Sequence, residues 1–137
     1  MYPYQHFISC IILSIVLWPF FGALSLLCFI GGFLIDIDHN LWYMYKYKTW
    51  NGLKAYQYYT KLAKERKSDG RSIMVFHSIE FSTIVFVLSF FYNPVALILL
   101  GLIMHWILDS IHKLKKNAFD DRVFSLVYEL LINPDKK

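Results

Sequence analysis

The chain has 137 residues, enough for one compact domain, and 57% of them are hydrophobic while only 18% are charged. Soluble domains have about 45–50% apolar and about 25% charged residues, so an ordinary soluble protein is disfavoured. All fourteen Lys and Arg residues lie in 46–71 and 113–137. This layout is typical of a membrane protein with several spans. The net charge of +4 therefore indicates loops that face an anionic leaflet, with no nucleic-acid partner.

The first apolar stretch covers 7–35, which is too long for one span of about 20 residues and short for two. Pro19 lies near its middle and would break or kink a helix. We predict a tight hairpin with helices at about 5–18 and 20–37. The alternative is one long kinked helix. Cys10 and Cys28 both fall in this stretch and are interpreted as small hydrophobic residues.

The middle of the chain, 41–72, is aromatic and basic, as expected at the headgroup level of a membrane. Leu53, Tyr56 and Tyr59 recur at helical spacing with Lys between them, which predicts an interfacial helix lying on the membrane. This segment contacts the lipid bilayer in the predicted arrangement.

Two more apolar runs follow, at 73–92 and 95–112, joined by a tight turn at Asn93-Pro94. The tail, 113–137, is basic and contains an amphipathic helix at 120–132. The predicted fold class is therefore all-α. The chain forms a single integral-membrane domain, 1–137, with about four short transmembrane helices.

The positive-inside rule places both basic segments and both termini in the cytoplasm, which predicts a protein of the cytoplasmic (inner) membrane. The ionisable residues of the spans then gather at the cytoplasmic ends of the helices. They are His6 at the start of the first span, Asp36, Asp38 and His39 at the end of the second, His77 and Glu80 at the start of the third, and His105, Asp109 and His112 at the end of the fourth. All five histidines of the protein thus lie in one layer.

The last of these groups has the spacing i, i+4, i+7, so His105, Asp109 and His112 fall within about 60° of arc on a helix. Ionisable side chains at membrane depth are costly and are a functional-site hypothesis by default. Carboxylates at a helix C-terminus, as predicted for Asp36 and Asp38, also oppose the macrodipole, and a bound cation would explain them. The structural alternative is that His105 only hydrogen-bonds a neighbouring helix while the other two mark the helix end.

Convergence of these residues favours a metal site. Imidazole and carboxylate ligands suit a divalent metal, with zinc first and manganese or iron as alternatives. The number of candidates favours two ions over one. The predicted ligands are Asp36, His39, His77, His105, Asp109, His112 and His6. Asp38 lies about 200° around the helix from Asp36, so it reaches the site only if the helix frays.

A metal in this layer would lower the pKa of a bound water to about 7 and generate hydroxide. Glu80 or Asp38 is the candidate general base. A site beside a Lys- and Tyr-rich surface helix suits an amphiphile with an anionic head, so a lipid or phosphoester substrate is expected. The sequence leaves the substrate and the oligomeric state open.

The motif order Asp36-x-Asp38-His39, His77-Ser78 and Gly101-x-x-x-His105-x-x-x-Asp109 resembles the membrane-bound metal-dependent hydrolase family, inner-membrane proteins with a LexA-binding member. The resemblance implies four short spans and a hydrolytic metal site, with His6 matching a family histidine near the first span. It covers most of the chain except 41–72 and the tail.

Two departures from the family pattern favour another reading. Ile35 stands where the family has Pro, and Ser72-Ile73 and Phe76 replace a His-Arg pair and a Thr. The alternative to a hydrolase is thus a non-catalytic metal-binding or regulatory membrane protein. A metal permease is a third hypothesis, disfavoured because the outer halves of the last two spans carry no polar path.

Overall fold

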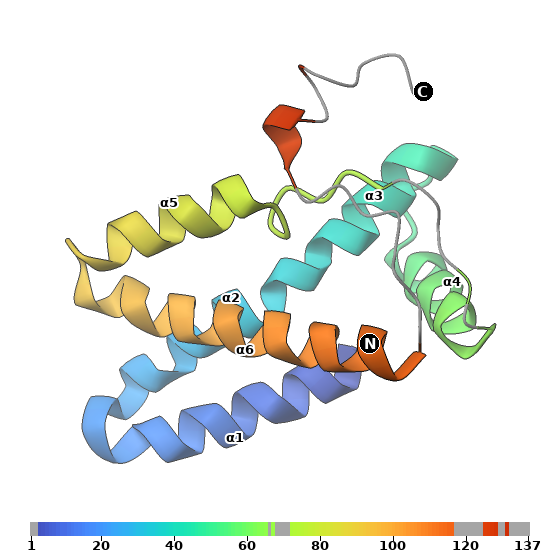
Figure 1. The fold of residues 1–137 in the computed structure, drawn as a ribbon. Helices are drawn as coiled ribbons and strands as arrows, with labels where there is room; N and C mark the ends of the chain where they lie inside the picture. The colour runs from blue at the N-terminus through green and yellow to red at the C-terminus, as the bar shows by residue number, and fades with distance from the viewer. Residues whose placement is uncertain (1–2, 66, 68–71, 117–124, 129–130, 132–137) are drawn as a thin grey trace.

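The computed structural model describes residues 3–65, 67, 72–116, 125–128 and 131, and within them the elements of regular structure are helices (Figure 1). The predicted all-α class is confirmed. In chain order the elements are α1 Pro3–Phe21, the 3-10 helix η1 Gly22–Leu27, α2 Cys28–Gly32, the 3-10 helix η2 Leu34–Asp36, α3 Ile37–Tyr47, α4 Gly52–Glu65, α5 Ile79–Ser89 and α6 Asn93–Lys116. Most of the helix predicted at 120–132 lies outside the described residues.

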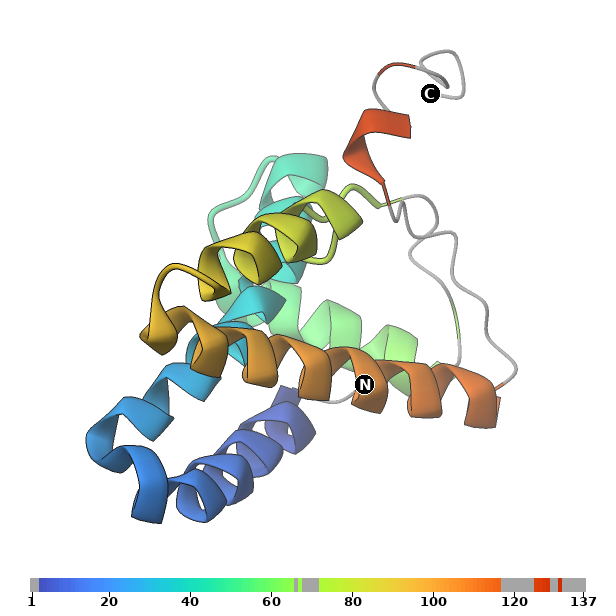
Figure 2. The same ribbon diagram turned by 60° about the vertical axis from the view of Figure 1, so that its left-hand side comes forward.

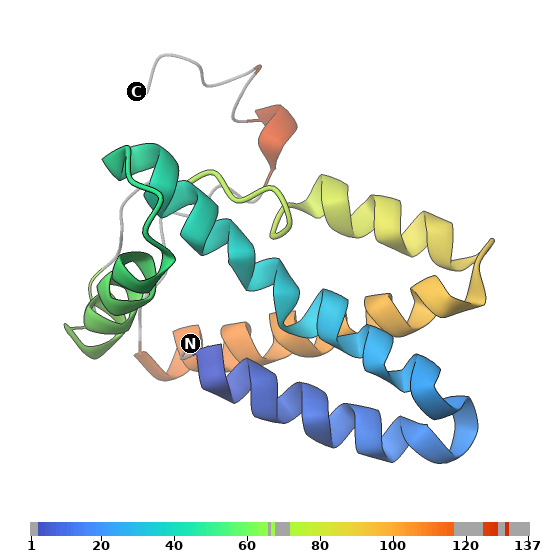
Figure 3. The ribbon, with the colours of Figure 1, turned by 180° about the vertical axis from the view of Figure 1, so that it is seen from behind.

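The chain reverses after α1, and η1 and α2 return along it (Figure 3). The reversal occurs at Gly22, which has a φ of +53°, a conformation that glycine adopts without steric cost. Helix α1 runs through Pro19 and ends at Phe21, later than the predicted end at 18. Proline near a helix end removes few hydrogen bonds, so the glycine determines where the chain turns.

Helix α2 crosses α6 with the two backbones in contact, which requires glycine on both sides. A Cβ added to Gly31 would collide with the Ile98 carbonyl, and one added to Gly101 would collide with the Cys28 carbonyl. Small residues allow this close approach between membrane helices. The crossing places the second arm of the hairpin directly beside the part of α6 that precedes His105.

The second arm differs from the predicted helix at 20–37. It is a run of 3-10 and α segments that continues into α3, so Asp36 takes the N-cap position and Asp38 lies in the first turn of α3. The macrodipole favours carboxylates at a helix N-terminus. The expectation that these carboxylates end a helix and oppose its dipole is therefore wrong.

Helix α5 begins at Ile79, six residues after the predicted start at 73. Ser78 caps it by accepting a hydrogen bond from the backbone N–H of Phe81, 3.2 Å away. His77 therefore lies in the loop that precedes the helix. Figure 2 shows α5 and α6 side by side and antiparallel. Residues 90–92 join them, so Asn93 and Pro94, predicted to form the turn, instead begin α6.

Helix α4 packs against α3 (Figure 1). Its start is capped by Asn51, whose side-chain Oδ1 accepts from the backbone N–H of Lys54 at 3.0 Å. Tyr47 and Tyr58 join the two helices through a hydroxyl–hydroxyl hydrogen bond of 2.9 Å. The Tyr47–Tyr58 bond holds α4 against the C-terminal end of α3.

Two helical stretches are long and apolar enough to cross a membrane, Pro3–Tyr47, which includes the reversal at Gly22, and Asn93–Lys115. Ile79–Ser89 is a shorter apolar helix. Large apolar side chains such as Ile15, Phe20 and Phe91 are more than 60% exposed, whereas His6 and His105 are at most 1% exposed. This arrangement is the reverse of that in a soluble domain and fits a protein surrounded by lipid.

Candidate metal centre

Histidine and aspartate side chains from four segments meet in one place. The N-terminal part of α1, the start of α3, the loop before α5 and the C-terminal half of α6 each contribute. The residues are His6, Asp36, Asp38, His39, His77, His105 and Asp109. The structure thus brings together seven of the nine side chains predicted from the sequence.

His105, on α6, is fully buried and has its tautomer fixed by the backbone. Its Nδ1 lies 2.9 Å from the carbonyl oxygen of Gly32, and a carbonyl only accepts hydrogen bonds, so Nδ1 carries the proton. The lone pair of the neutral ring is then on Nε2. An imidazole bound through its other nitrogen to a carbonyl is the usual arrangement of a histidine metal ligand.

His77 is held in the same way by a carboxylate. Its Nδ1 lies 3.3 Å from Oδ2 of Asp38, and the same oxygen accepts a hydrogen bond from the backbone N–H of Phe76. Asp38 is 4% exposed. The carboxylate therefore fixes the loop before α5 and leaves Nε2 of His77 free to bind an ion.

The two free nitrogens face each other, and Asp36 completes a triangle. Nε2 of His77 and Nε2 of His105 are 3.1 Å apart, and Oδ1 of Asp36 is 3.7 Å from each. The centre of this triangle lies about 2.0 Å from every corner, which matches Zn–N and Zn–O bond lengths. Two lone pairs that face each other repel, and a cation between them removes the repulsion. These three residues could therefore hold one metal ion.

His39 lies at the more open side of this triangle. Its Nε2 is 3.7 Å from Oδ1 of Asp36, and its ring meets the ring of His77 edge-on, with centroids 5.4 Å apart. The side chains of His39 and Asp36 are 20% and 16% exposed, against 0% for His105. The ring of Tyr59, on α4, lies 4.9 Å from that of His39. The centre thus opens toward α3 and α4.

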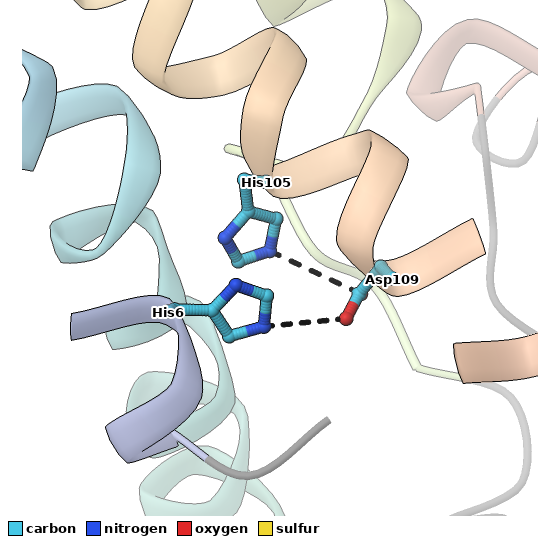
Figure 4. A group of neighbouring side chains, drawn as sticks. All are labelled: His6, His105 and Asp109. Atoms are coloured by element: carbon cyan, nitrogen blue, oxygen red, sulfur yellow. Dashed lines mark ion pairs between the residues drawn. The ribbon is translucent and has the colours of Figure 1, made fainter. Parts of the chain in front are cut away.

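A second group lies on the other side of His105 (Figure 4). Nε2 of His6 is 3.4 Å from Oδ1 of Asp109, and Nε2 of His105 is 3.9 Å from Oδ2 of Asp109. These three residues could also hold an ion. Both groups use Nε2 of His105, and one lone pair binds one ion. The two groups therefore cannot both be complete at the same time.

The geometry of the rings favours the first group. The rings of His6 and His105 are stacked, with centroids 3.9 Å apart and planes inclined by 16°. The lone pair of an imidazole nitrogen lies in the plane of its ring, and two stacked, nearly parallel planes share no point close to both rings where one ion could bind. His77 and His105 are inclined by 66°, which allows their lone pairs to meet.

Two predicted residues are not brought to the centre. Both oxygens of the Glu80 carboxylate accept hydrogen bonds from the C-terminal segment, from Ser125 Oγ and from the backbone N–H groups of Leu126 and Val127. His112 lies one turn beyond Asp109 on α6 and belongs to neither group of candidate ligands. The candidate base Glu80 instead holds the tail.

Sequence reasoning missed the backbone groups that orient the imidazoles. The carbonyl of Gly32 and the N–H of Phe76 carry no side-chain signal. The only sequence signal was the placement of Gly101 four residues before His105, opposite the pair Gly31-Gly32. That pattern indicates a close helix crossing.

Comparisons with protein-family models, with curated proteins and with solved structures find no match for this chain. The arrangement of the His and Asp side chains and the apolar helices are therefore the structural evidence for a function.

Proposed function

We propose that the protein is an integral-membrane metal-dependent hydrolase whose metal is bound by Asp36, His77 and His105. The observation that carries the proposal is the triangle of Asp36 Oδ1 and the two Nε2 atoms, whose centre is about one Zn–ligand bond length from each corner. Three protein ligands and one open position are the arrangement of a catalytic zinc site.

The chain's own groups give each ligand a defined role. Gly32 and Asp38 hold the two imidazoles so that both Nε2 lone pairs face inward. Asp36 supplies the negative charge, and its exposed side leaves room for a water or substrate oxygen next to His39. A divalent ion there would supply Lewis-acid activation of a water molecule near neutral pH. Zinc fits this two-nitrogen, one-oxygen set best, with manganese and iron as the alternatives.

The membrane arrangement that we propose has four short spans, with the centre at the cytoplasmic boundary of the inner membrane and both termini in the cytoplasm. The confinement of Lys and Arg to 46–71 and 113–137 supports this orientation. The exposed apolar surfaces of α1 and α5 support their contact with lipid.

The expected substrate is a lipid or another phosphoester. The open side of the centre faces α4, where Tyr59 contacts His39. The stretch 39–64 contains five Lys residues and no Asp or Glu. A positive, aromatic surface beside the opening favours an amphiphile with an anionic head. The resemblance of the Asp-x-Asp-His, His-Ser and Gly-x-x-x-His-x-x-x-Asp motifs to membrane-bound metal-dependent hydrolases supports the same reaction class.

A second candidate is a non-catalytic metal-binding or regulatory membrane protein. The position of Glu80 favours it, because this carboxylate is bound by residues 125–127 and is not free to act as a base at the centre.

A hydrolysis screen separates the two. Purified protein in detergent, loaded with zinc or manganese, would be given phosphomonoesters, phosphodiesters, carboxylic esters and amides. We expect turnover of a phosphoester that is lost in His105→Ala and after chelation. Metal binding without turnover of any substrate would reject the hydrolase and favour the regulatory protein.

A further inference from the structure

Helix α1 buries two polar side chains and a small cysteine on one face and exposes large apolar side chains on the other. Its buried residues are His6, Cys10 and Ser14, which recur every four residues on one face. Ile12 and Ile15, by contrast, are 57% and 67% exposed. In a lipid environment an apolar exterior is expected, and the polar face must then be satisfied inside the protein.

The opposite wall of this face consists of small residues whose backbone carbonyls accept hydrogen bonds. Ser25 on η1 and Cys28 on α2 are both 0% exposed. Ser14 Oγ donates to the carbonyl oxygen of Ser25 at 3.1 Å, and Cys10 Sγ lies 3.9 Å from the carbonyl oxygen of Cys28. We call the strip formed by His6, Cys10, Ser14, Ser25 and Cys28 the α1 seam.

Two polar atoms in the α1 seam have no hydrogen-bond partner among the described residues. They are Oγ of Ser25 and Nδ1 of His6, and the two residues are 0% and 1% exposed. Leaving a buried polar atom unpaired costs about 1–3 kcal/mol. Internal water is the usual partner of such atoms in proteins. The unpaired atoms lie at the two ends of the strip, one beside the metal centre and one beside Ser14.

We infer that the α1 seam binds a file of internal water molecules that leads from the metal centre to Ser25. The eight helical steps from His6 to Ser14 give it a length of about 12 Å. It ends there, because the residues of α1 beyond Ser14 are apolar or proline and none of them is buried. The seam is thus closed on the side of the Gly22 turn and opens at the His/Asp centre.

The role of this water rests on the proposed function, since a hydrolase consumes one water per turnover. The presence of water in the α1 seam does not depend on that function. A seam that is merely a close-packed interface of small polar residues would be dry, and this difference can be measured without metal or turnover.

The two native cysteines are reporters of water inside the seam. Metal-free protein in lipid nanodiscs would be treated with Ag⁺, a small hydrated cation that binds thiols and does not partition into lipid. The thiols left unblocked would then be alkylated after unfolding and located by peptide mass spectrometry. We expect Ag⁺ to block Cys10 in the native protein even though it is 0% exposed.

Variants of the seam provide the control. Ser25→Val replaces the hydroxyl with methyl groups and should slow the blocking of Cys10 about tenfold, because the water loses its polar partner. Ser25→Ala should slow it in the same direction without adding bulk. Ser9→Val is the matched control, since Ser9 lies on α1 outside the buried face and bonds its own helix at Gln5.

A Cys10 that stays unblocked until the protein is unfolded would overturn the inference. Equal blocking rates in wild type, Ser25→Val and Ser9→Val would also overturn it, because the thiol would then be reached by general opening of the helices.

Discussion

Replacing Asp38 by Asn tests whether this carboxylate orients a ligand or binds the metal itself. Oδ2 of Asp38 accepts from Nδ1 of His77 and from the backbone N–H of Phe76, and the residue is 4% exposed. Asn keeps the shape but loses the charge, so it holds both donors less firmly. Loss of such a partner lowers metal affinity about 10–100-fold. That range corresponds to about 1.4–2.7 kcal/mol of binding free energy.

The assay is competition for zinc with a chromophoric chelator, in detergent, for wild type, Asp38→Asn and Asp36→Asn. Asp36 contributes a ligand atom to the triangle, so Asp36→Asn should lose more affinity than Asp38→Asn. Equal losses in the two variants would show that Asp38 is itself a ligand. An Asp38→Asn variant with wild-type affinity would refute its role in orienting His77.

Three further predictions concern the tail, the helix crossing and the topology. Glu80→Gln should keep wild-type metal content but weaken the docking of the segment around Ser125, which would be measured as faster proteolysis of the C-terminal tail. Loss of metal in this variant would show that Glu80 belongs to the metal centre. Gly101→Ala should lose both thermal stability and metal, since its Cβ meets the Cys28 carbonyl. Gly22→Ala should lower the free energy of unfolding by only about 1–2 kcal/mol and keep the metal. A Cys in place of Lys54 should be labelled from the cytoplasmic side of intact vesicles, and labelling only from the opposite side would reverse the proposed orientation.

The sequence was sufficient to predict the helical class and the gathering of ionisable residues, because both follow from strong patterns. Confinement of Lys and Arg to two segments predicts which parts of the chain would lie outside a bilayer. Ionisable side chains within apolar runs are costly unless they are paired or bind an ion. For this reason the sequence predicts Asp36, His77 and His105 as metal ligands. In the structure their ligand atoms are close enough to one another to bind a single ion.

The roles of Asp38 and Glu80 could not be predicted, because they depend on where helices begin. A helix assumed to continue through 73–80 places His77 and Glu80 on one face. The observed helix starts after Ser78, so His77 lies in a loop and Glu80 faces the tail. In the same way, a helix assumed to end near 37 gave no reason for Asp38 to meet His77, whereas the start of α3 brings it there.

The number of bound ions also could not be predicted from the sequence. The nine candidate residues favoured two ions, but their number does not reveal that two groups share one nitrogen. The hydrogen bond from His105 Nδ1 to the Gly32 carbonyl uses one side of the ring and leaves a single lone pair for both groups.

Metal analysis of the purified protein is the most direct test of the central claim, with each variant purified in the same way. We expect about one zinc, manganese or iron ion per chain in wild type and in His112→Ala, and almost none in His105→Ala. Wild-type protein without bound metal after incubation with these ions, or a His105→Ala variant that keeps its full complement, would contradict the account.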